Sequence, residues 1–306
     1  MSKFFITGGA GFIGSHVAEE LLKGGWGEVV IYDDLSGGFK RNLDALKGTF
    51  KLIKGDVRKY SKLEKSMKDA DYVVHLAAFV SAFDSYNKPQ LTHEINIQGT
   101  NNVLEAANNC GVRRVVLASS AAIYGTEANL PNTEALLPRP ESPYAISKIC
   151  NEYQAFMFTK IYGLKTVALR LFNVFGPRQS DTSQYSGVIS RFLSAFQNKA
   201  NPEIYGDGSQ TRDFISVKDV ARSIILALTN DRCGLGEVMN IGTGRETNLL
   251  QILTAFDEIY GVKQTRTFKP WRDGDIKRSV ANVTRAKELL GFEAQISLKD
   301  GLRLMA

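Results

Sequence analysis

Thr7-Gly8-Gly9-Ala10-Gly11-Phe12-Ile13-Gly14 is the stretch that decides the fold of this 306-residue chain. The apolar run 4–6 before it predicts a buried strand, and 15–22 after it has apolar residues at helical spacing. A turn with glycines three residues apart, set between a strand and a helix, is typical of dinucleotide binding. The first of these glycines permits the tight turn, the second lets the backbone approach a pyrophosphate, and the third lets the helix pack close to the strand. We therefore expect the helix N-terminus to face the phosphates of a dinucleotide.

An acidic residue follows at the distance that this interpretation requires. Asp33 comes 19 positions after Gly14, at the end of the apolar run 29–32. A carboxylate there can accept hydrogen bonds from both ribose hydroxyls of an adenosine, and it would repel a 2′-phosphate. The sequence therefore favours NAD over NADP. The alternative is that Asp33 only caps the turn between its strand and the following loop.

The composition indicates a soluble globular protein, with 43% hydrophobic and 23% charged residues. The three cysteines form no metal pattern and no even disulfide set, so we expect a reducing, cytoplasmic setting and no metal. No apolar run approaches the length of a membrane span, and we expect no signal peptide before the first strand. The net charge is +6, but acidic residues interrupt the basic segment 51–68 at helical spacing. We therefore expect a solvated helix face and an anionic small substrate, and no nucleic-acid or membrane partner.

Strands and helices alternate through the first half of the chain. Strands are predicted at 4–6, 29–32, 50–53, 71–76 and 114–118, and helical spacing covers 91–107. This alternation predicts an α/β fold with a Rossmann-type, doubly wound parallel sheet. Ligands of such sheets bind at the carboxyl ends of the strands.

Small and polar residues occur at these predicted strand ends. Asp56 could reach an adenine amino group, and Ala77 with Ala78 leaves room for the cofactor backbone. Asn96, on the predicted helix 91–107, could hydrogen-bond to a neighbouring strand. His75 lies inside an apolar run, so we expect a core histidine rather than a catalyst.

A tyrosine and a lysine four residues apart suggest acid–base chemistry. Tyr144 and Lys148 share one face of a helix that Pro143 can begin, and Ser120 ends a predicted strand 24 residues before the tyrosine. A free tyrosine has a pKa near 10, but a nearby ammonium and a nicotinamide cation favour the phenolate. Tyr144 could then take a proton from a sugar or alcohol hydroxyl. Taken alone, a tyrosine and a lysine at this spacing would be a chance occurrence. The dinucleotide turn upstream and the serine at the strand end make chance the weaker interpretation.

Together these motifs carry a family resemblance. TGGAGFIGSH, the loop around Asp33, GDV, HLAA, SSAAIYG and YAISK resemble the extended short-chain dehydrogenase/reductases over nearly the whole chain. Within that superfamily the chain most resembles nucleotide-sugar epimerases of the UDP-glucose 4-epimerase type. The resemblance implies an isomerase that uses NAD to epimerise C4 of a UDP-hexose through a transient 4-keto sugar. It also implies a role for Asn173 and Arg212 at the diphosphate.

The resemblance extends to the rest of the site. It implies a second phosphate-binding arginine, Arg272, and Asp275 on the uridine ribose, and it places Ser279 beside the sugar. The residues expected to contact substrate are Ser120, Tyr144, Asn173, Val188, Tyr205, Arg212, Arg272, Asp275 and Ser279. The residues expected to contact the cofactor are Gly8, Gly11, Phe12, Ile13, Gly14, Asp33, Asp34, Asp56, Val57, Leu76, Ala77, Ala78, Asn96, Ser119, Tyr144 and Lys148. Ser120, Tyr144 and Lys148 are the expected catalytic residues.

Related chemistries remain to be separated. Ala121 and Ala122 stand where nucleotide-sugar 4,6-dehydratases carry an Asp-Glu pair and UDP-glucuronate decarboxylases a glutamate, so we exclude both. The main expectation is interconversion of UDP-glucose and UDP-galactose, with the N-acetyl forms also accepted because Ser279 is small. A UDP-glucuronate 4-epimerase, an NAD-dependent nucleotide-sugar oxidoreductase and a non-catalytic dinucleotide sensor remain alternatives.

We also expect a particular organisation of the chain. Residues 1–173 should form the NAD-binding domain, with segments around 215–245 returning to it, and 174–306 should mainly bind the UDP-sugar. Helices at 91–107 and 144–160 have more apolar surface than one sheet face needs. In similar proteins these two helices pair across a two-fold axis, so we expect a homodimer.

Overall fold

A computed structural model describes residues 1–126, 129–180, 187–271 and 276–306. Seven parallel strands form its central sheet: β1 (Ser2–Thr7), β2 (Gly27–Asp33), β3 (Phe50–Lys54), β4 (Tyr72–His75), β5 (Arg114–Ser120), β6 (Thr166–Leu171) and β11 (Leu235–Ile241). Their order is β11-β6-β5-β4-β1-β2-β3. This is the doubly wound sheet that the sequence predicts, and that prediction is confirmed.

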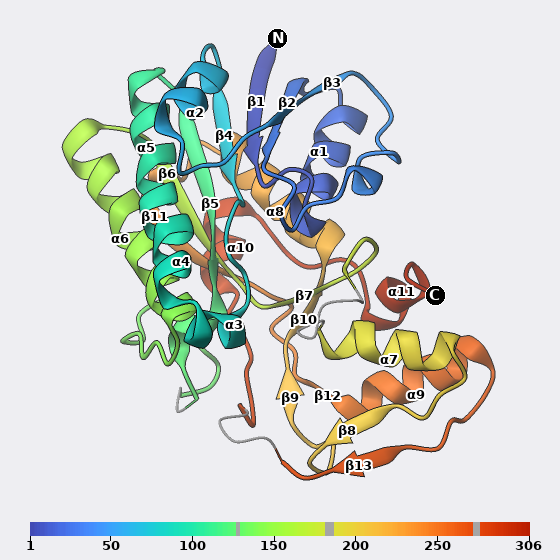
Figure 1. Cartoon of the computed structure of the whole chain (residues 1–306). Coiled ribbons are helices and arrows are strands. Elements are labelled where there is room, and N and C mark those ends of the chain that lie inside the picture. Colours follow the sequence, from blue (N-terminus) through green and yellow to red (C-terminus); the bar gives the residue numbers. More distant parts are fainter. Residues whose placement is uncertain (127–128, 181–186, 272–275) are drawn as a thin grey trace.

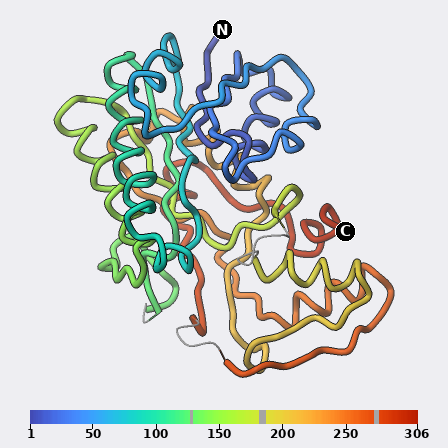
Figure 2. The backbone as a smooth tube through the Cα atoms, in the orientation of Figure 1, coloured from blue at the N-terminus to red at the C-terminus, as the bar shows by residue number. Residues whose placement is uncertain are grey.

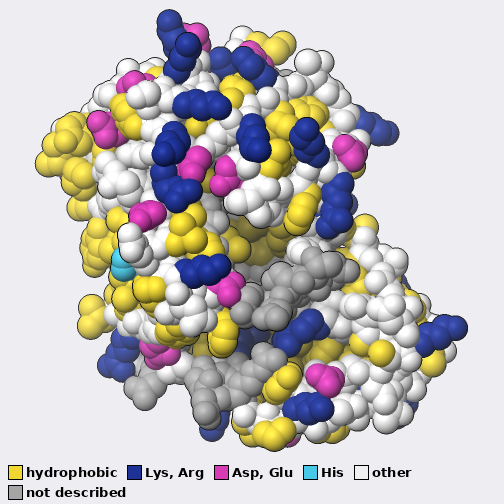
Figure 3. Space-filling model, viewed as in Figure 1, with side chains coloured by type: hydrophobic (Ala, Val, Ile, Leu, Met, Phe, Trp, Pro, Cys, Tyr) yellow, Lys and Arg dark blue, Asp and Glu magenta, His cyan; other side chains and the backbone are white. Residues whose placement is uncertain are grey.

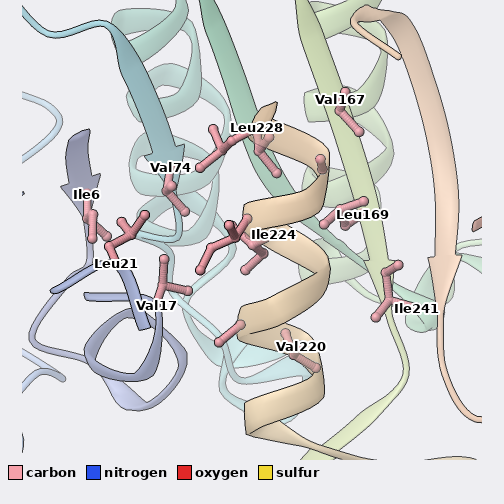
Figure 4. Packing of buried hydrophobic residues seen from close by; sticks show 14 of the residues in the cluster. Ile6, Val17, Leu21, Val74, Val167, Leu169, Val220, Ile224, Leu228 and Ile241 are labelled. Carbon is pink, nitrogen blue, oxygen red and sulfur yellow. The ribbon is translucent and has the colours of Figure 1, made fainter. Parts of the chain in front are cut away.

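Helices cover both faces of the sheet (Figure 1). One face carries α1 (Phe12–Lys23), α8 (Val217–Thr229) and α10 (Thr284–Leu290); the other carries α2 (Tyr60–Met67), α5 (Gly99–Asn109) and α6 (Pro143–Tyr162). Figure 4 shows aliphatic side chains of α1 and α8 packed against the strands, among them Val17, Leu21, Ile224 and Leu228. Each of these is almost fully buried, and each such burial stabilises the fold by about 1.5–3 kcal/mol.

The strand order reverses beside β1. After β1 the chain adds β2 and β3 on one side, and then returns to place β4 on the other side of β1. The carboxyl ends of β1 and β4 therefore diverge into loops on opposite sides. Open α/β sheets bind ligands at such a switch point, and the glycine turn begins there.

The helical run predicted at 91–107 is a chain of three pieces. It consists of α4 (Pro89–His93), a π-helical segment η2 (Glu94–Gln98) and α5, and α3 (Ala82–Asn87) precedes it. Two short 3-10 segments, η1 (Lys40–Asn42) and η3 (Ala121–Tyr124), follow β2 and β5. Apolar spacing does not distinguish a π turn from an α turn, so the sequence could not predict η2. Short π segments occur often at functional sites.

A second group of elements packs below the sheet in Figure 1. It contains β7 (Asn173–Phe175), α7 (Val188–Gln197), β8 (Glu203–Tyr205), β9 (Thr211–Arg212), β10 (Phe214–Ser216), β12 (Thr247–Asn248), α9 (Leu249–Tyr260), β13 (Thr267–Lys269) and α11 (Leu298–Arg303). Its hydrophobic cluster includes Phe192, Phe196 and Phe256. Figure 2 shows the chain leaving the sheet after β6 and returning to it at β11. The domain division at residue 173 stays a prediction. Among the described residues no helix is long and apolar enough to cross a membrane.

Candidate functional site

The glycine turn closes tightly between β1 and α1. The Gly8 N–H donates to the Tyr32 carbonyl at 2.9 Å, and the Gly11 N–H donates to the Gly8 carbonyl at 3.1 Å. Gly8 has a φ of +68°, and a Cβ there would lie 2.6 Å from the Ala77 nitrogen. A Cβ at Gly14 would lie 2.3 Å from the Gly8 oxygen. Only glycine fits these two positions without movement of the backbone.

The neighbouring residues fit a dinucleotide at this turn. Gly11 caps α1 with no side-chain hydrogen bond, so the helix begins with backbone N–H groups and a positive dipole end, which suit a pyrophosphate. Phe12 and Ile13, both half-buried, form the first turn. The helix N-terminus and the glycine turn thus leave backbone N–H groups for a pyrophosphate, and the cofactor contacts of these residues stay a prediction.

Asp33 holds the glycine turn from the end of β2. One carboxylate oxygen accepts the Ala10 N–H at 2.9 Å, and the other accepts the Leu35 N–H at 2.8 Å. Burial raises the pKa of Asp33, and these two hydrogen bonds oppose the rise. Asp34 accepts from the backbone and hydroxyl of Ser36 in the next turn. Asp33 thus caps a turn as well, which is compatible with its expected contact to ribose because each oxygen keeps a lone pair.

The ends of β3 and β4 carry the next expected cofactor residues. Asp56 follows β3 and forms an ion pair with Arg58 at 2.6 Å, which lowers the pKa of Asp56. Buried Val57 follows it, and the half-buried run Leu76, Ala77 and Ala78 follows β4.

Asn96 lies in η2 and contacts a loop rather than a strand. Its amide accepts from the Phe79 N–H at 2.7 Å and donates to the Phe79 carbonyl at 3.1 Å and to the Ser147 hydroxyl at 2.9 Å. Asn96 therefore links the loop after β4 to α6. His75, which ends β4, is buried between the Thr7 and Thr100 hydroxyls. Burial lowers its pKa to about 3, so it is a neutral core histidine.

The three expected catalytic residues come together. Ser120 ends β5, and Tyr144 and Lys148 lie in the first two turns of α6, which Ser142 caps by accepting from the Ala145 N–H at 3.1 Å. The polar side chain of Ser120 lies beside the Tyr144 hydroxyl and acts on its pKa. The Lys148 Nζ lies 5.7 Å from the centre of the Tyr144 ring and donates to the Ala118 carbonyl at 2.9 Å.

The electrostatics of this trio differ from the sequence expectation. Burial raises the pKa of Tyr144, and the Ser120 side chain opposes the rise. Burial also lowers the pKa of Lys148 to about 8, while the Glu152 carboxylate raises it. We expected Lys148 to favour the phenolate. Here the ammonium donates to a backbone carbonyl instead, and desolvation of the tyrosine dominates.

Three of the expected substrate residues gather around the segment 211–214. Asn173 begins β7, and its N–H donates to the Asp213 carbonyl at 3.0 Å. Arg212 lies on β9 and donates to the Thr211 carbonyl at 2.9 Å. Ser279 is buried, and its N–H donates to the same carbonyl at 3.2 Å. Val188 begins α7 and Tyr205 ends β8; Arg272 and Asp275 lie outside the described residues.

Two residues that support the site escaped the sequence analysis. Asp213 is fully buried and accepts from the backbone N–H groups of Thr243, Gly244 and Ala281, so it holds the segment between Arg212 and β10. Glu152 lies one turn after Lys148 and accepts from the Ser119 hydroxyl at 2.5 Å, which turns that hydroxyl toward α6. The spacing of four from Lys148 was the available signal for Glu152.

The sheet, the glycine turn and the serine–tyrosine–lysine cluster together define an enzyme of the dinucleotide-binding short-chain dehydrogenase/reductase class. The chain belongs to the NAD dependent epimerase/dehydratase family, whose model matches residues 4–242. NAD is its cofactor, as the sequence predicts. The protein is thus an isomerase that resembles UDP-glucose 4-epimerase.

Relatives agree along almost the whole chain. It is 37% identical over 302 residues to the UDP-glucose 4-epimerase of Mycolicibacterium smegmatis, a match that covers 97% of this chain and 95% of the relative. It is 36% identical, with a TM-score of 0.94, to the UDP-N-acetylglucosamine 4-epimerase of Methanobrevibacter ruminantium, solved with UDP-N-acetylmuramic acid, over 99% of this chain and 96% of that one. The UDP-glucose 4-epimerase of Thermotoga maritima, solved with UDP-glucose, is 36% identical with a TM-score of 0.92, over 99% and 97% of the two chains.

Proposed function

We propose that the protein epimerises C4 of a UDP-hexose, interconverting UDP-glucose and UDP-galactose and also the N-acetyl forms. The observation that carries this proposal is the convergence of Ser120, Tyr144 and the buried Lys148, whose Nζ lies 5.7 Å from the centre of the Tyr144 ring. The relatives named for UDP-glucose and for UDP-N-acetylglucosamine support the substrate class. The trio stands at the carboxyl ends of the sheet, where the glycine turn also lies.

In the proposed reaction, Tyr144 takes the proton of the sugar 4-hydroxyl and later returns it. The Ser120 hydroxyl hydrogen-bonds to the same sugar oxygen. The positive charge of Lys148, 5.7 Å from the ring centre, and the nicotinamide cation of bound NAD would together oppose the burial that raises the pKa of Tyr144, and so favour its charged form. NAD, when bound, supplies the chemistry of accepting the C4 hydride and giving it back, so no external reductant is consumed. Between the two hydride transfers, the 4-keto sugar rotates within the site so that its other face receives the hydride.

The substrate residues would hold UDP while the sugar turns. Arg212 is suited to a phosphate because its guanidinium is planar and always charged. Asn173 would bind the same diphosphate, and Arg272 with Asp275 would complete the contacts. Val188 and Tyr205 would line the nucleotide side. Asp213 supports this arrangement by fixing the backbone next to Arg212.

A panel of UDP-sugars tests the proposal. Purified protein without added cofactor is incubated with UDP-glucose, UDP-galactose, their N-acetyl forms and UDP-glucuronate, and the sugars are followed by NMR. We expect interconversion of the glucose and galactose forms, and of their N-acetyl counterparts. Turnover of UDP-glucuronate alone would favour a glucuronate epimerase. A released keto sugar would favour an oxidoreductase, and NAD binding with no turnover a sensor.

We also propose that the protein forms a homodimer through α6. The side chains of Ile146, Tyr153, Met157 and Ile161 are exposed and recur at helical spacing along one face of α6. Hydrophobic side chains lie along the left edge of the molecule in Figure 3, where Figure 1 places α6. The exposed large hydrophobic residues do not include any from α5, so α6 would dominate the interface. A monomeric mass by light scattering at micromolar concentration would contradict this proposal.

A further inference from the structure

A row of polar side chains crosses three strands beside the catalytic trio. The sheet register pairs Ser119 of β5 with Arg170 of β6, and Arg170 with Asn240 of β11. Glu152 reaches this row from α6. Glu152 is 5% exposed and Arg170 is 4% exposed, so both charges are buried within the protein. Buried charges require partners, and each partner here can be identified.

Both oxygens of the Glu152 carboxylate are engaged. The Arg170 Nε donates to one oxygen at 2.9 Å and the Arg170 Nη2 to the other at 2.8 Å, and the Ser119 hydroxyl also donates to the first. The remaining nitrogen of Arg170 donates to the Tyr124 hydroxyl at 2.9 Å, and that hydroxyl donates to Asn240 at 2.6 Å. The pair is therefore a bidentate ion pair inside a connected network.

This network joins α6 to the strand that carries Ser120. Lys148 and Glu152 lie on successive turns of one helix face. Lys148 donates to the Ala118 carbonyl, and Glu152 accepts from the Ser119 hydroxyl. Two successive residues of β5 are thus bound by two successive turns of α6, and the next residue along the strand is Ser120. Tyr144 lies one turn earlier on the same helix.

We propose that Glu152 is a positioning residue for the catalytic trio, fixing α6 against the end of β5 and supplying the negative charge that keeps the buried Lys148 side chain an ammonium. The proposal rests on the proposed function for the role of Tyr144. Its structural part, the effect of Glu152 on Lys148, can be measured without any sugar.

Among the charged and titratable groups around Lys148, Glu152 is the one whose charge raises the pKa of Lys148. Burial lowers the pKa of Lys148 to about 8, although the Glu152 carboxylate raises it. Loss of that carboxylate would therefore lower the pKa of Lys148 further and favour the uncharged amine. Tyr144 faces Lys148 from the same helix and His75 from β4, and burial keeps both uncharged. Arg170 of β6 is paired with Glu152. Glu94 and Glu105, on helices beside α6, are exposed to solvent, where their fields are screened.

Three variants separate the charge of Glu152 from the stability of the ion pair. Glu152→Gln removes the charge and keeps an acceptor for Ser119. Arg170→Gln breaks the same ion pair and keeps the carboxylate, so it is the matched control. Because one unpaired buried charge is strongly destabilising, the double variant Glu152→Gln/Arg170→Gln replaces both charges by amides that can hydrogen-bond to each other. If Glu152→Gln does not fold, the double variant carries the test.

The readouts are the titration of Lys148 and the pH profile of kcat. Lys148 is followed by NMR in isotopically labelled protein with no sugar present, its signal being assigned by its loss in Lys148→Arg. We expect Glu152→Gln to lower the midpoint by about one pH unit and to move the alkaline limb of kcat equally. The double variant should lower both as well, whereas Arg170→Gln, which removes a positive charge, should lower neither.

Three results would overturn the proposal. The first is an unchanged midpoint of the Lys148 titration in both variants that lack Glu152. The second is a midpoint in Arg170→Gln that falls as far as in Glu152→Gln. The third is a double variant that fails to fold, which would assign the ion pair to folding alone. Wild-type protein that interconverts no UDP-sugar would instead contradict the proposed function, and the NMR comparison would still decide the effect of Glu152 on Lys148.

Discussion

On the cofactor side of the site, the glycine turn 7–14 and Asp33 lie within the first 33 residues, in one strand–turn–helix–strand unit. On the substrate side, Asn173, Arg212 and Ser279 come from three segments spread over more than a hundred residues. Short pairings bring those segments together: β7 pairs with β10, which follows Arg212, and Thr211 forms a bridge with Arg278, next to Ser279.

The difference shows what a local pattern can specify. The cofactor side is held by contacts between near neighbours, such as Asp33 with Ala10 and Gly11 with Gly8, and changes there should act on NAD. The substrate side depends on buried polar contacts between distant segments, such as Asp213 with Gly244 and Ala281. Changes there should act on the UDP-sugar and leave NAD in place, which makes the two sides separable by experiment.

The largest effect is expected where the two sides meet. Tyr144→Phe removes only the hydroxyl that lies beside Ser120. A positioned acid–base group contributes about 100-fold or more to rate, so we expect kcat to fall by at least about 100-fold, while NAD content and melting temperature stay near wild type. Progress curves on the preferred UDP-sugar measure the rate. Activity within a few-fold of wild type would remove Tyr144 from its proposed role.

The next effect should appear in substrate binding alone. Arg212→Ala removes a guanidinium proposed to bind phosphate, and a hydrogen bond to a charged group contributes about 1.5–3 kcal/mol. We expect KM for the UDP-sugar to rise by about tenfold to a hundredfold with NAD content unchanged. Arg278→Ala is the matched control, because Arg278 is exposed and paired with Glu246 at 2.9 Å. Equal effects of the two variants would argue against a phosphate contact at Arg212.

The cofactor side can be altered by one methyl group. A Cβ at Gly14 would lie 2.3 Å from the Gly8 oxygen, and relieving such overpacking costs about 1–3 kcal/mol. We expect Gly14→Ala to weaken NAD binding by about tenfold or more, measured as dinucleotide released on denaturation. Gly37→Ala is the matched control and should retain NAD, because a Cβ built at Gly37 would meet no neighbouring atom within 4 Å. The released dinucleotide should be NAD by mass, and recovery of mainly NADP would contradict the role of Asp33.

Sequence could predict the cofactor side because its signals are local. Gly8, Gly14 and Asp33 stand at fixed spacings around one turn, and the parallel sheet follows from the alternation of strands and helices. Glu152 and Arg170 could not be found in this way, because charged residues are usually exposed and their burial depends on α6 packing over the ends of β5 and β6. The raised pKa of Tyr144 likewise reflects desolvation, which no spacing reveals.

The smallest change in turnover of UDP-glucose is expected from Ser279→Tyr, which tests the breadth of the substrate side. Ser279 lies between two backbone ties: its own N–H donates to the Thr211 carbonyl at 3.2 Å, and the next residue, Val280, accepts from the Asn132 N–H at 2.8 Å. Because these two hydrogen bonds restrict the backbone, it cannot move freely to relieve a steric clash of a tyrosine at this position. The tyrosine ring must therefore occupy space beside the segment that carries Arg212. We expect Ser279→Tyr to lose turnover of UDP-N-acetylglucosamine by steric exclusion and to keep turnover of UDP-glucose within a few-fold.

Lys277→Tyr is the control, because Lys277 is exposed on the same segment and its substitution should leave the ratio of the two rates unchanged. Ser279 is only 8% exposed, and if neighbouring side chains already fill the sugar pocket, wild-type protein will ignore the N-acetyl sugar or the ratio will not respond to the tyrosine. Either result would show that Ser279 does not set the substrate range.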